Sequence, residues 1–159
     1  MVNRRSKLSE LSVKFYNPED VKIEKLKFVV IQAKYKDKWI FVRHKERDTL
    51  EIPGGHIEEN ETPDEAAKRE LYEESGAIKF VLRSICAYSV CRKDEEESYG
   101  MLYYGEVEEI GDLPEYEIAE IKLLDELPNN LTYESIQPLL FEKVHEETRK
   151  DIIAKNVIK

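Results

Sequence analysis

Three glutamates, Glu70, Glu73 and Glu74, have the spacing of residues that share one face of an α-helix. With about 3.6 residues per turn, positions i, i+3 and i+4 fall within roughly 100° of one another. Their charges repel, and the C-terminal half of a helix is an unfavourable place for anions. A divalent cation would relieve both effects. Carboxylate oxygens with no Cys or His beside them favour a hard ion, Mg²⁺ or alternatively Mn²⁺, and make zinc a poor fit.

The segment that carries these acids has the start and stop signals of a short helix. Thr62 is a good N-cap, Pro63 suits the first helical position, and Glu65 completes a capping box with Thr62. Gly76 can adopt the left-handed conformation that ends many helices. The sequence therefore predicts a helix from Pro63 to about Ser75.

The same segment resembles the signature box of the Nudix hydrolases. The matching letters are Gly55, then after five residues Glu61, then after seven residues Arg69-Glu70-Leu71, then Glu73-Glu74 and Gly76. The box ends at Ala77, its one departure, because the family pattern has a larger aliphatic residue there. The resemblance implies a Nudix-type α/β/α sandwich that hydrolyses a nucleoside diphosphate linked to another group, with Mg²⁺ shielding the phosphate oxygens while water attacks in line.

The resemblance also implies a set of metal ligands. The carbonyl oxygen of Gly54 would join Glu70, Glu73 and Glu74. Gly54 and Gly55 lack a Cβ, which lets the backbone approach a ligand closely. Glu70 or Glu73 would serve as the general base, since the metal lowers the pKa of water enough for an ordinary glutamate to act.

Supporting roles fall to charged residues inside and outside the box. Arg69 is interpreted as holding a neighbouring carboxylate through paired hydrogen bonds, which fixes the acidic cluster. Glu61 is interpreted as a loop acid that orients the helix acids. Relatives of this family also recruit an acid from a loop outside the box, and Glu117 is the candidate here, with Glu115 and Glu120 as rivals.

The wider pattern predicts one α/β domain over residues 1–159. A mixed sheet is expected from apolar runs at 11–15, 28–31, 39–42, 50–52, 77–91, 101–107 and 118–124. Tyr133, Ile136, Leu140 and Val144 recur at helical spacing and predict a C-terminal helix over about 132–148 that packs on the sheet. Helices on both faces would make an α/β sandwich.

Composition excludes several classes of function. A net charge of −9 argues against general affinity for nucleic acid or anionic membranes, and no run is long enough to span a membrane. Cys86 and Cys91 have neither disulfide nor zinc spacing and are interpreted as reduced thiols in a cytoplasmic protein. His44, His56 and His145 are scattered, so no histidine constellation is predicted.

The substrate is less constrained. The basic stretch at residues 43–48 looks like the corresponding part of MutT-type nucleoside triphosphatases, and Arg43 and Arg47 are candidate phosphate ligands. Asn129 or Asn130 could read a purine edge. Ile52 replaces an aromatic residue that MutT relatives often have, so base stacking would have to come from another aromatic, with Tyr35, Trp39 and Tyr103 as candidates.

Two hypotheses of different classes follow. The first is a Mg²⁺-dependent diphosphohydrolase of a purine nucleoside triphosphate such as 8-oxo-dGTP, with ADP-ribose, a nucleotide sugar or an RNA 5′ end as alternative substrates. The second is a Nudix-shaped module that binds a nucleotide without hydrolysing it. Intact Glu70, Glu73 and Glu74 beside Arg69 favour the enzyme, while the choice between monomer and homodimer stays open.

Overall fold

The structure is a computed structural model that describes the backbone of residues 11–158 and the side chains of residues 11–150. The strands are β1 (Leu11–Tyr16), β2 (Leu26–Tyr35), β3 (Lys38–His44), β4 (Gly54–His56), β5 (Ala77–Arg92), β6 (Ser98–Ile110) and β7 (Ile118–Leu124). The helices of this part of the chain are α2 (Pro63–Ser75) and α3 (Gln137–Ile158), with 3₁₀ turns η1 (Pro18–Asp20) and η2 (Ile23–Lys25). The ends of the predicted domain lie outside the described residues.

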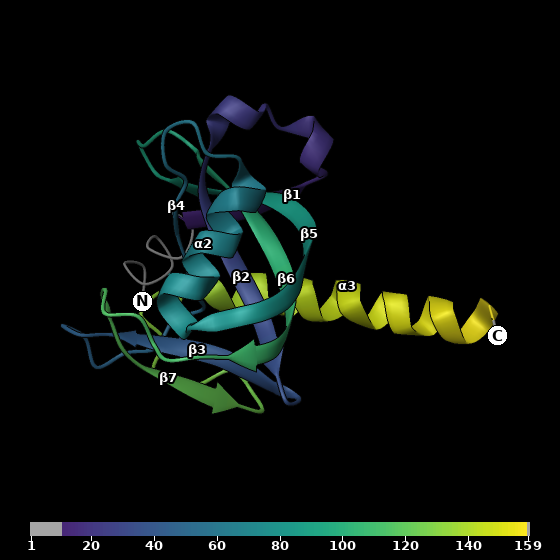
Figure 1. Cartoon of the computed structure of the whole chain (residues 1–159). Helices are drawn as coiled ribbons and strands as arrows, with labels where there is room; N and C mark the ends of the chain where they lie inside the picture. The colour runs from purple at the N-terminus through teal and green to yellow at the C-terminus, as the bar shows by residue number, and fades with distance from the viewer. Residues whose placement is uncertain (1–10, 159) are drawn as a thin grey trace.

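One mixed sheet forms the centre of the fold, as the sequence predicted. The strand order is β1-β5-β6-β2-β3-β7, and β4 pairs with β2 away from this path. β2 and β6 run parallel, whereas the other pairings within the sheet are antiparallel. Figure 1 shows α2 in front of the strands and α3 behind them. This arrangement confirms the predicted α/β/α sandwich.

The central strands are apolar on both faces because a helix covers each face. On β2, Val29 and Ile31 pack in the core cluster that contains Leu71 of α2. Their neighbour Val30 packs in the opposite cluster, which contains Leu140 of α3. Continuous apolar runs in the sequence therefore correspond to strands buried between two layers.

Helix α2 begins and ends where its local signals predict. The Thr62 hydroxyl accepts a hydrogen bond from the Glu65 N–H at 3.1 Å, and the Glu65 carboxylate accepts one from the Thr62 N–H at 2.9 Å. Gly76 closes the helix with φ of 78°. The capping box fixes the first turn, and the position of every acid on α2 follows from it.

The C-terminal helix begins later than predicted. Residues 132–136 form turns, and α3 starts at Gln137 instead of 132. A helix that began at 132 would carry Pro138 in its interior, where proline removes a hydrogen bond and clashes with the preceding turn. In the structure Pro138 lies in the first turn, where its missing N–H is harmless. Leu140 is buried as predicted.

The prediction of a strand at 50–52 is also wrong. Leu50 and Glu51 form only isolated bridges, to Leu131 and Val42 respectively, and the strand of this region, β4, lies at Gly54–His56. β4 pairs with β2 through the two glycines. The pairing needs a glycine at position 54, because a Cβ there would lie 2.4 Å from the Val29 carbonyl oxygen.

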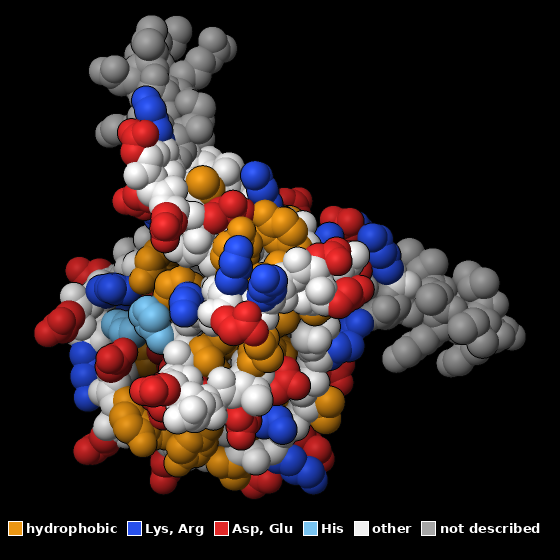
Figure 2. All heavy atoms as spheres, turned by 90° about the horizontal axis from the view of Figure 1, so that it is seen from above, with side chains coloured by type: hydrophobic (Ala, Val, Ile, Leu, Met, Phe, Trp, Pro, Cys, Tyr) orange, Lys and Arg blue, Asp and Glu red, His pale blue; other side chains and the backbone are white. Residues whose placement is uncertain are grey.

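The surface carries mixed charge. Figure 2 shows acidic and basic side chains intermingled over the face that it draws. Cys86 and Cys91 are free thiols, as expected. Within residues 11–158 no helix has the length and hydrophobicity needed to cross a bilayer.

Candidate active site

Glu70 and Glu74 of α2 face a cavity beside β4. Glu74 is only 6% exposed, and its Oε1 accepts a hydrogen bond from the Gly54 N–H at 3.0 Å. Glu70 lies against Gly55 so closely that a Cβ there would come within 2.5 Å of the carboxyl group. The two glycines therefore let β4 touch both acids.

Arg69 holds several carboxylates at once. Its Nε and Nη2 donate to the two oxygens of Glu61 at 2.7 and 2.9 Å, and Nη1 donates to Glu70 at 2.7 Å and to Glu73 at 3.3 Å. Nη2 also donates to the His56 carbonyl oxygen at 3.0 Å. The hydrogen bonds with Arg69 lower the pKa of the Glu61 carboxyl group. Arg69 therefore joins the loop acid Glu61 to Glu70 and Glu73 of α2.

We expect Arg69→Lys to reduce the free energy of unfolding by about 2 kcal/mol, because an ammonium group cannot reproduce the paired hydrogen bonds to Glu61 while also holding Glu70. Urea denaturation followed by circular dichroism measures the change. Arg149→Lys, at an exposed arginine of α3, is the matched control. Equal stability of the two variants would contradict the role given to Arg69.

A histidine lies beside the acids, contrary to the sequence-based expectation. His44, the last residue of β3, has its Nε2 2.6 Å from Oε1 of Glu51 and 3.7 Å from Oε2 of Glu74. Its Nδ1 lies 3.8 Å from Oε2 of Glu117. Arg47 holds the other oxygen of Glu51 at 3.0 Å. One of the three histidines therefore joins the acidic cluster, and Glu51 was missed by the sequence analysis.

Pairing between β3 and β7 brings Glu117 to this cluster. His44 is paired with Ile118, and the Lys45 N–H donates to the Glu117 carbonyl oxygen at 2.9 Å. The side chain of Glu117 lines the cavity, whereas the rival Glu120 is held by Arg43 at 2.8 Å. Of the three candidate acids, Glu117 lines the cavity, whereas Glu115 and Glu120 do not.

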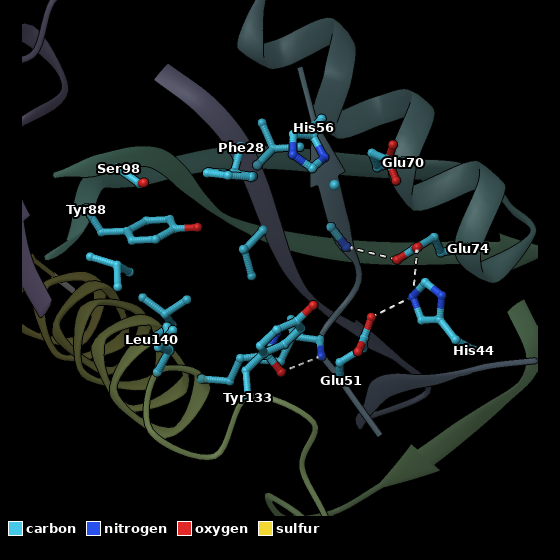
Figure 3. Close-up of a pocket in the computed structure, with 18 of the residues that line it drawn as sticks. Phe28, His44, Glu51, His56, Glu70, Glu74, Tyr88, Ser98, Tyr133 and Leu140 are labelled. Carbon is cyan, nitrogen blue, oxygen red and sulfur yellow. Dashed lines mark hydrogen bonds and ion pairs between the residues drawn. The ribbon is translucent and has the colours of Figure 1, made fainter. Parts of the chain in front are cut away.

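The cavity has a volume of about 660 Å³ and two chemically different ends. Figure 3 shows Glu70, Glu74 and His44 at one end and Tyr88 and Leu140 at the other. The apolar end is bounded by side chains from β5, from the turn before α3 and from α3 itself, and its lining includes Tyr88, Val90, Ile136 and Leu140. The volume of the whole cavity is within the range of about 300–1,000 Å³ that small-molecule sites occupy.

Several predicted site residues lie elsewhere. Arg47 lines the cavity, but Arg43 and the exposed Asn129 are not among its lining residues. Glu73 is turned toward Arg69 and does not line the cavity either. None of the three aromatics considered for base stacking contributes to the lining of the described cavity: Tyr35, Trp39 and Tyr103.

Comparison with known proteins decides the family. The profile of the NUDIX domain matches residues 24–143 of this chain. The chain belongs to the Nudix family. This Nudix protein is 31% identical over 130 residues to "Putative 8-oxo-dGTP diphosphatase YtkD" of Bacillus subtilis (strain 168), an alignment that covers 76% of this chain and 81% of YtkD.

Solved structures agree with that assignment. The Bacillus subtilis pyrophosphohydrolase BsRppH superposes with a TM-score of 0.73 at 25% identity, covering 87% of this chain and 93% of BsRppH. The NUDIX domain of Shewanella oneidensis NrtR, solved with ADP ribose, has a TM-score of 0.57 at 17% identity over 84% of this chain and 94% of that domain. The NrtR likeness concerns the fold alone. This Nudix protein is a pyrophosphohydrolase, a hydrolase of pyrophosphate-containing substrates.

The residues at the acidic end fit the divalent cation that Nudix hydrolases generally use. His44, Glu74 and Glu117 each offer a ligand atom, and these atoms lie within 4.8 Å of one another. Burial is the main cause that raises the pKa of Glu74 to about 8, and the charges of Glu70, Glu51 and Glu117 raise it further against the opposing Gly54 hydrogen bond. A bound cation would offset the repulsion between these neighbouring carboxylates and so favour their ionised forms.

We therefore expect the metal-free Nudix protein to lose stability as the pH rises. The Glu74 pKa is about 8 in the folded protein against 4.5 for the free side chain, so between these values the folded state retains a proton that the unfolded chain releases. The free energy of unfolding should fall by a few kcal/mol from about pH 5 to about pH 8.

Urea denaturation in EDTA at several pH values measures this loss. Glu74→Gln, which cannot ionise, should give a much flatter profile. Because Mg²⁺ binds the ionised carboxylate, its stabilising effect should grow over the same pH interval. A wild-type profile in EDTA that coincides with that of Glu74→Gln would contradict the placement of Glu74.

Proposed function

We propose that this protein is a Mg²⁺-dependent nucleoside triphosphate diphosphohydrolase that converts a purine substrate such as 8-oxo-dGTP to the monophosphate and diphosphate. The observation that carries the proposal is a single cavity with an acidic end on α2 and an apolar, aromatic end against α3. A nucleotide likewise has one charged and one largely apolar end: its phosphates need charge compensation, and its base needs apolar contact. The similarity to YtkD supports the choice of an oxidised purine.

The metal would be held by Glu70 and Glu74 of α2, with the Gly54 carbonyl and Glu117 contributing from β4 and the loop before β7. Glu73, which Arg69 holds at 3.3 Å, would join them by turning away from Arg69. Mn²⁺ would be an alternative ion for the same oxygen ligands. When bound, the cation screens the phosphate charge and helps to activate water. The Gly54 N–H keeps Glu74 aimed at the cavity, and Arg69 keeps Glu70 beside Gly55.

Glu70 is the acid best placed to take the proton from the attacking water. It lines the cavity, and only its Oε1 is held by Arg69, at 2.7 Å. Its Oε2 stays available to accept a proton, which is the geometric requirement for a general base. Glu73, turned toward Arg69 at 3.3 Å, is the weaker candidate.

The far end of the cavity would receive the base. Tyr88 offers an aromatic surface there, and Phe28, whose ring centroid lies 4.7 Å from that of His56, offers a second one on the cavity wall. These two rings would stack on the base in place of Tyr35, Trp39 and Tyr103. Arg47 also lines the cavity, where it is bound to Glu51 and has its guanidinium 5.9 Å from the Tyr133 ring centroid. It is placed to contact a phosphate or the sugar when it leaves Glu51. Free thiols at Cys86 and Cys91 support a cytoplasmic location.

A second candidate is removal of diphosphate from an RNA 5′ end. The structural similarity to the pyrophosphohydrolase BsRppH favours this candidate, because the similarity extends over 93% of the BsRppH chain. The same acids would act on the same phosphate linkage, and only the group beyond the first nucleotide would differ.

A substrate panel tests the proposal. Purified protein is incubated in Mg²⁺ with 8-oxo-dGTP, dGTP, ADP-ribose and a 5′-triphosphorylated RNA, and the released diphosphate, phosphate and nucleoside monophosphate are quantified. We expect 8-oxo-dGTP to have the highest kcat/KM and to release diphosphate. A higher kcat/KM for the RNA would select the second candidate, and turnover of ADP-ribose alone would overturn both.

A further inference from the structure

We propose that His44 is a ligand of the metal site and that it makes the site prefer a transition-metal ion such as Mn²⁺ over Mg²⁺. The inference rests on the metal site of the proposed function and deepens it, since the ligands inferred from the sequence are all oxygen atoms. It follows from the position of one imidazole ring among three carboxylates.

The first step concerns which ring nitrogen is free. His44 is largely buried, and its Nε2 lies 2.6 Å from Oε1 of Glu51. Glu51 is itself buried and is held on its other oxygen by Arg47 at 3.0 Å, so it stays an acceptor. In the neutral ring Nε2 must then carry the proton, which leaves the lone pair on Nδ1. A carboxylate that accepts the remote N–H is the usual partner of a metal-binding histidine.

The second step concerns where the lone pair points. Nδ1 lies 3.8 Å from Oε2 of the loop acid Glu117, and the ligand atoms that His44, Glu117 and Glu74 offer lie within 4.8 Å of one another. The gap between Nδ1 and Glu117 is too long for a hydrogen bond. Two ligands at about 2.1 Å from one ion are separated by roughly 3–4 Å. The spacing between His44 and Glu117 therefore suits a shared ion better than direct contact.

The third step concerns which ion this donor set selects. Oxygen ligands alone suit Mg²⁺, which binds nitrogen ligands weakly and keeps its waters. Imidazole suits first-row transition metals, and the mixture of carboxylates with one imidazole suits Mn²⁺ or a later ion. The absence of Cys and His beside the acids was the reason to prefer a hard ion, Mg²⁺ or Mn²⁺, over zinc. With the imidazole of His44 beside Glu74 and Glu117, the donor set favours Mn²⁺ over Mg²⁺.

Pulsed electron paramagnetic resonance of the Mn²⁺-loaded full-length protein tests the inference without depending on activity. The wild type should show ¹⁴N modulation from a directly bound imidazole, replaced by ¹⁵N modulation when the protein is grown with ¹⁵N-labelled histidine. His44→Gln should lose the signal. His145→Gln, at a histidine that stacks on Phe141 outside the cavity, should keep it.

Calorimetric titration gives the second measurement. We expect His44→Gln to weaken Mn²⁺ binding about 10-fold or more and to change Mg²⁺ binding much less, while His145→Gln matches the wild type. If Mn²⁺ binds at the acids but the resonance spectrum shows no nitrogen coupling from histidine, the role of His44 is overturned and the proposed hydrolase function is left intact. Failure of both ions to bind, or binding that is unaffected by Glu74→Gln, overturns the metal site itself and the proposed function with it.

Discussion

Glu70→Gln is expected to lower kcat about 10²- to 10⁴-fold, the usual range for loss of a general acid or base. Glutamine has nearly the same size as glutamate and can still accept the hydrogen bond that Arg69 donates to Glu70 at 2.7 Å. The fold should therefore remain. Glutamine cannot take a proton from water or contribute a negative charge to a cation, so the loss should appear mainly in kcat.

Steady-state kinetics on the best substrate of the panel measure this effect, with circular dichroism as the test of folding. Glu108→Gln is the matched control, because Glu108 is an exposed acid on β6 that pairs only with Lys79 at 3.4 Å among the described contacts. If Glu70→Gln retained wild-type kcat, another acid would have to be the base, and the account of Glu70 would be wrong.

Gly55→Ala is expected to lower kcat about 10²-fold without unfolding the protein. A Cβ at this position would lie 2.5 Å from the carboxyl group of Glu70. That group is the mobile end of a side chain, so it can turn away, and the added methyl would displace the acid instead of breaking the sheet. A shift of about 1 Å in a reacting group can reduce the rate about 10²-fold.

Gly54→Ala is the matched comparison, because its added Cβ would meet backbone rather than a side chain. It would lie 2.4 Å from the Val29 carbonyl oxygen, in the pairing between β4 and β2. We expect Gly54→Ala to lower Tm clearly and Gly55→Ala to change Tm little. The reverse pattern, with Gly55→Ala unfolded and Gly54→Ala unaffected, would contradict the packing described for the two glycines.

The sequence predicted the bounds of α2 well because the signals are local. A capping box, a proline in the first turn and a left-handed glycine lie within the helix or beside it, and helical spacing alone groups Glu70 and Glu74. The strands buried on both faces were also recognisable, since their apolar runs do not depend on partner identity.

Features that depend on long-range pairing were not recoverable from local patterns: Glu117 was a candidate only through the family resemblance, and the positions of His44 and Glu51 were missed. His44, Glu51 and Glu117 meet because the end of β3 bridges to residue 51 on one side and pairs with the start of β7 on the other. Neither pairing leaves a signal in the local sequence. The late start of α3 could have been predicted, because Pro138 marks a first turn.

Metal dependence tests the central claim most directly. Protein stripped with EDTA is titrated with Mg²⁺, and separately with Mn²⁺, while diphosphate release from the best substrate is followed for the wild type and for Glu74→Gln. We predict no turnover in EDTA, full recovery of the wild type with either ion, and little recovery of Glu74→Gln at any concentration. Undiminished turnover in EDTA, or recovery of Glu74→Gln to the wild-type rate at the same metal concentration, would contradict an active site built on the acids of α2.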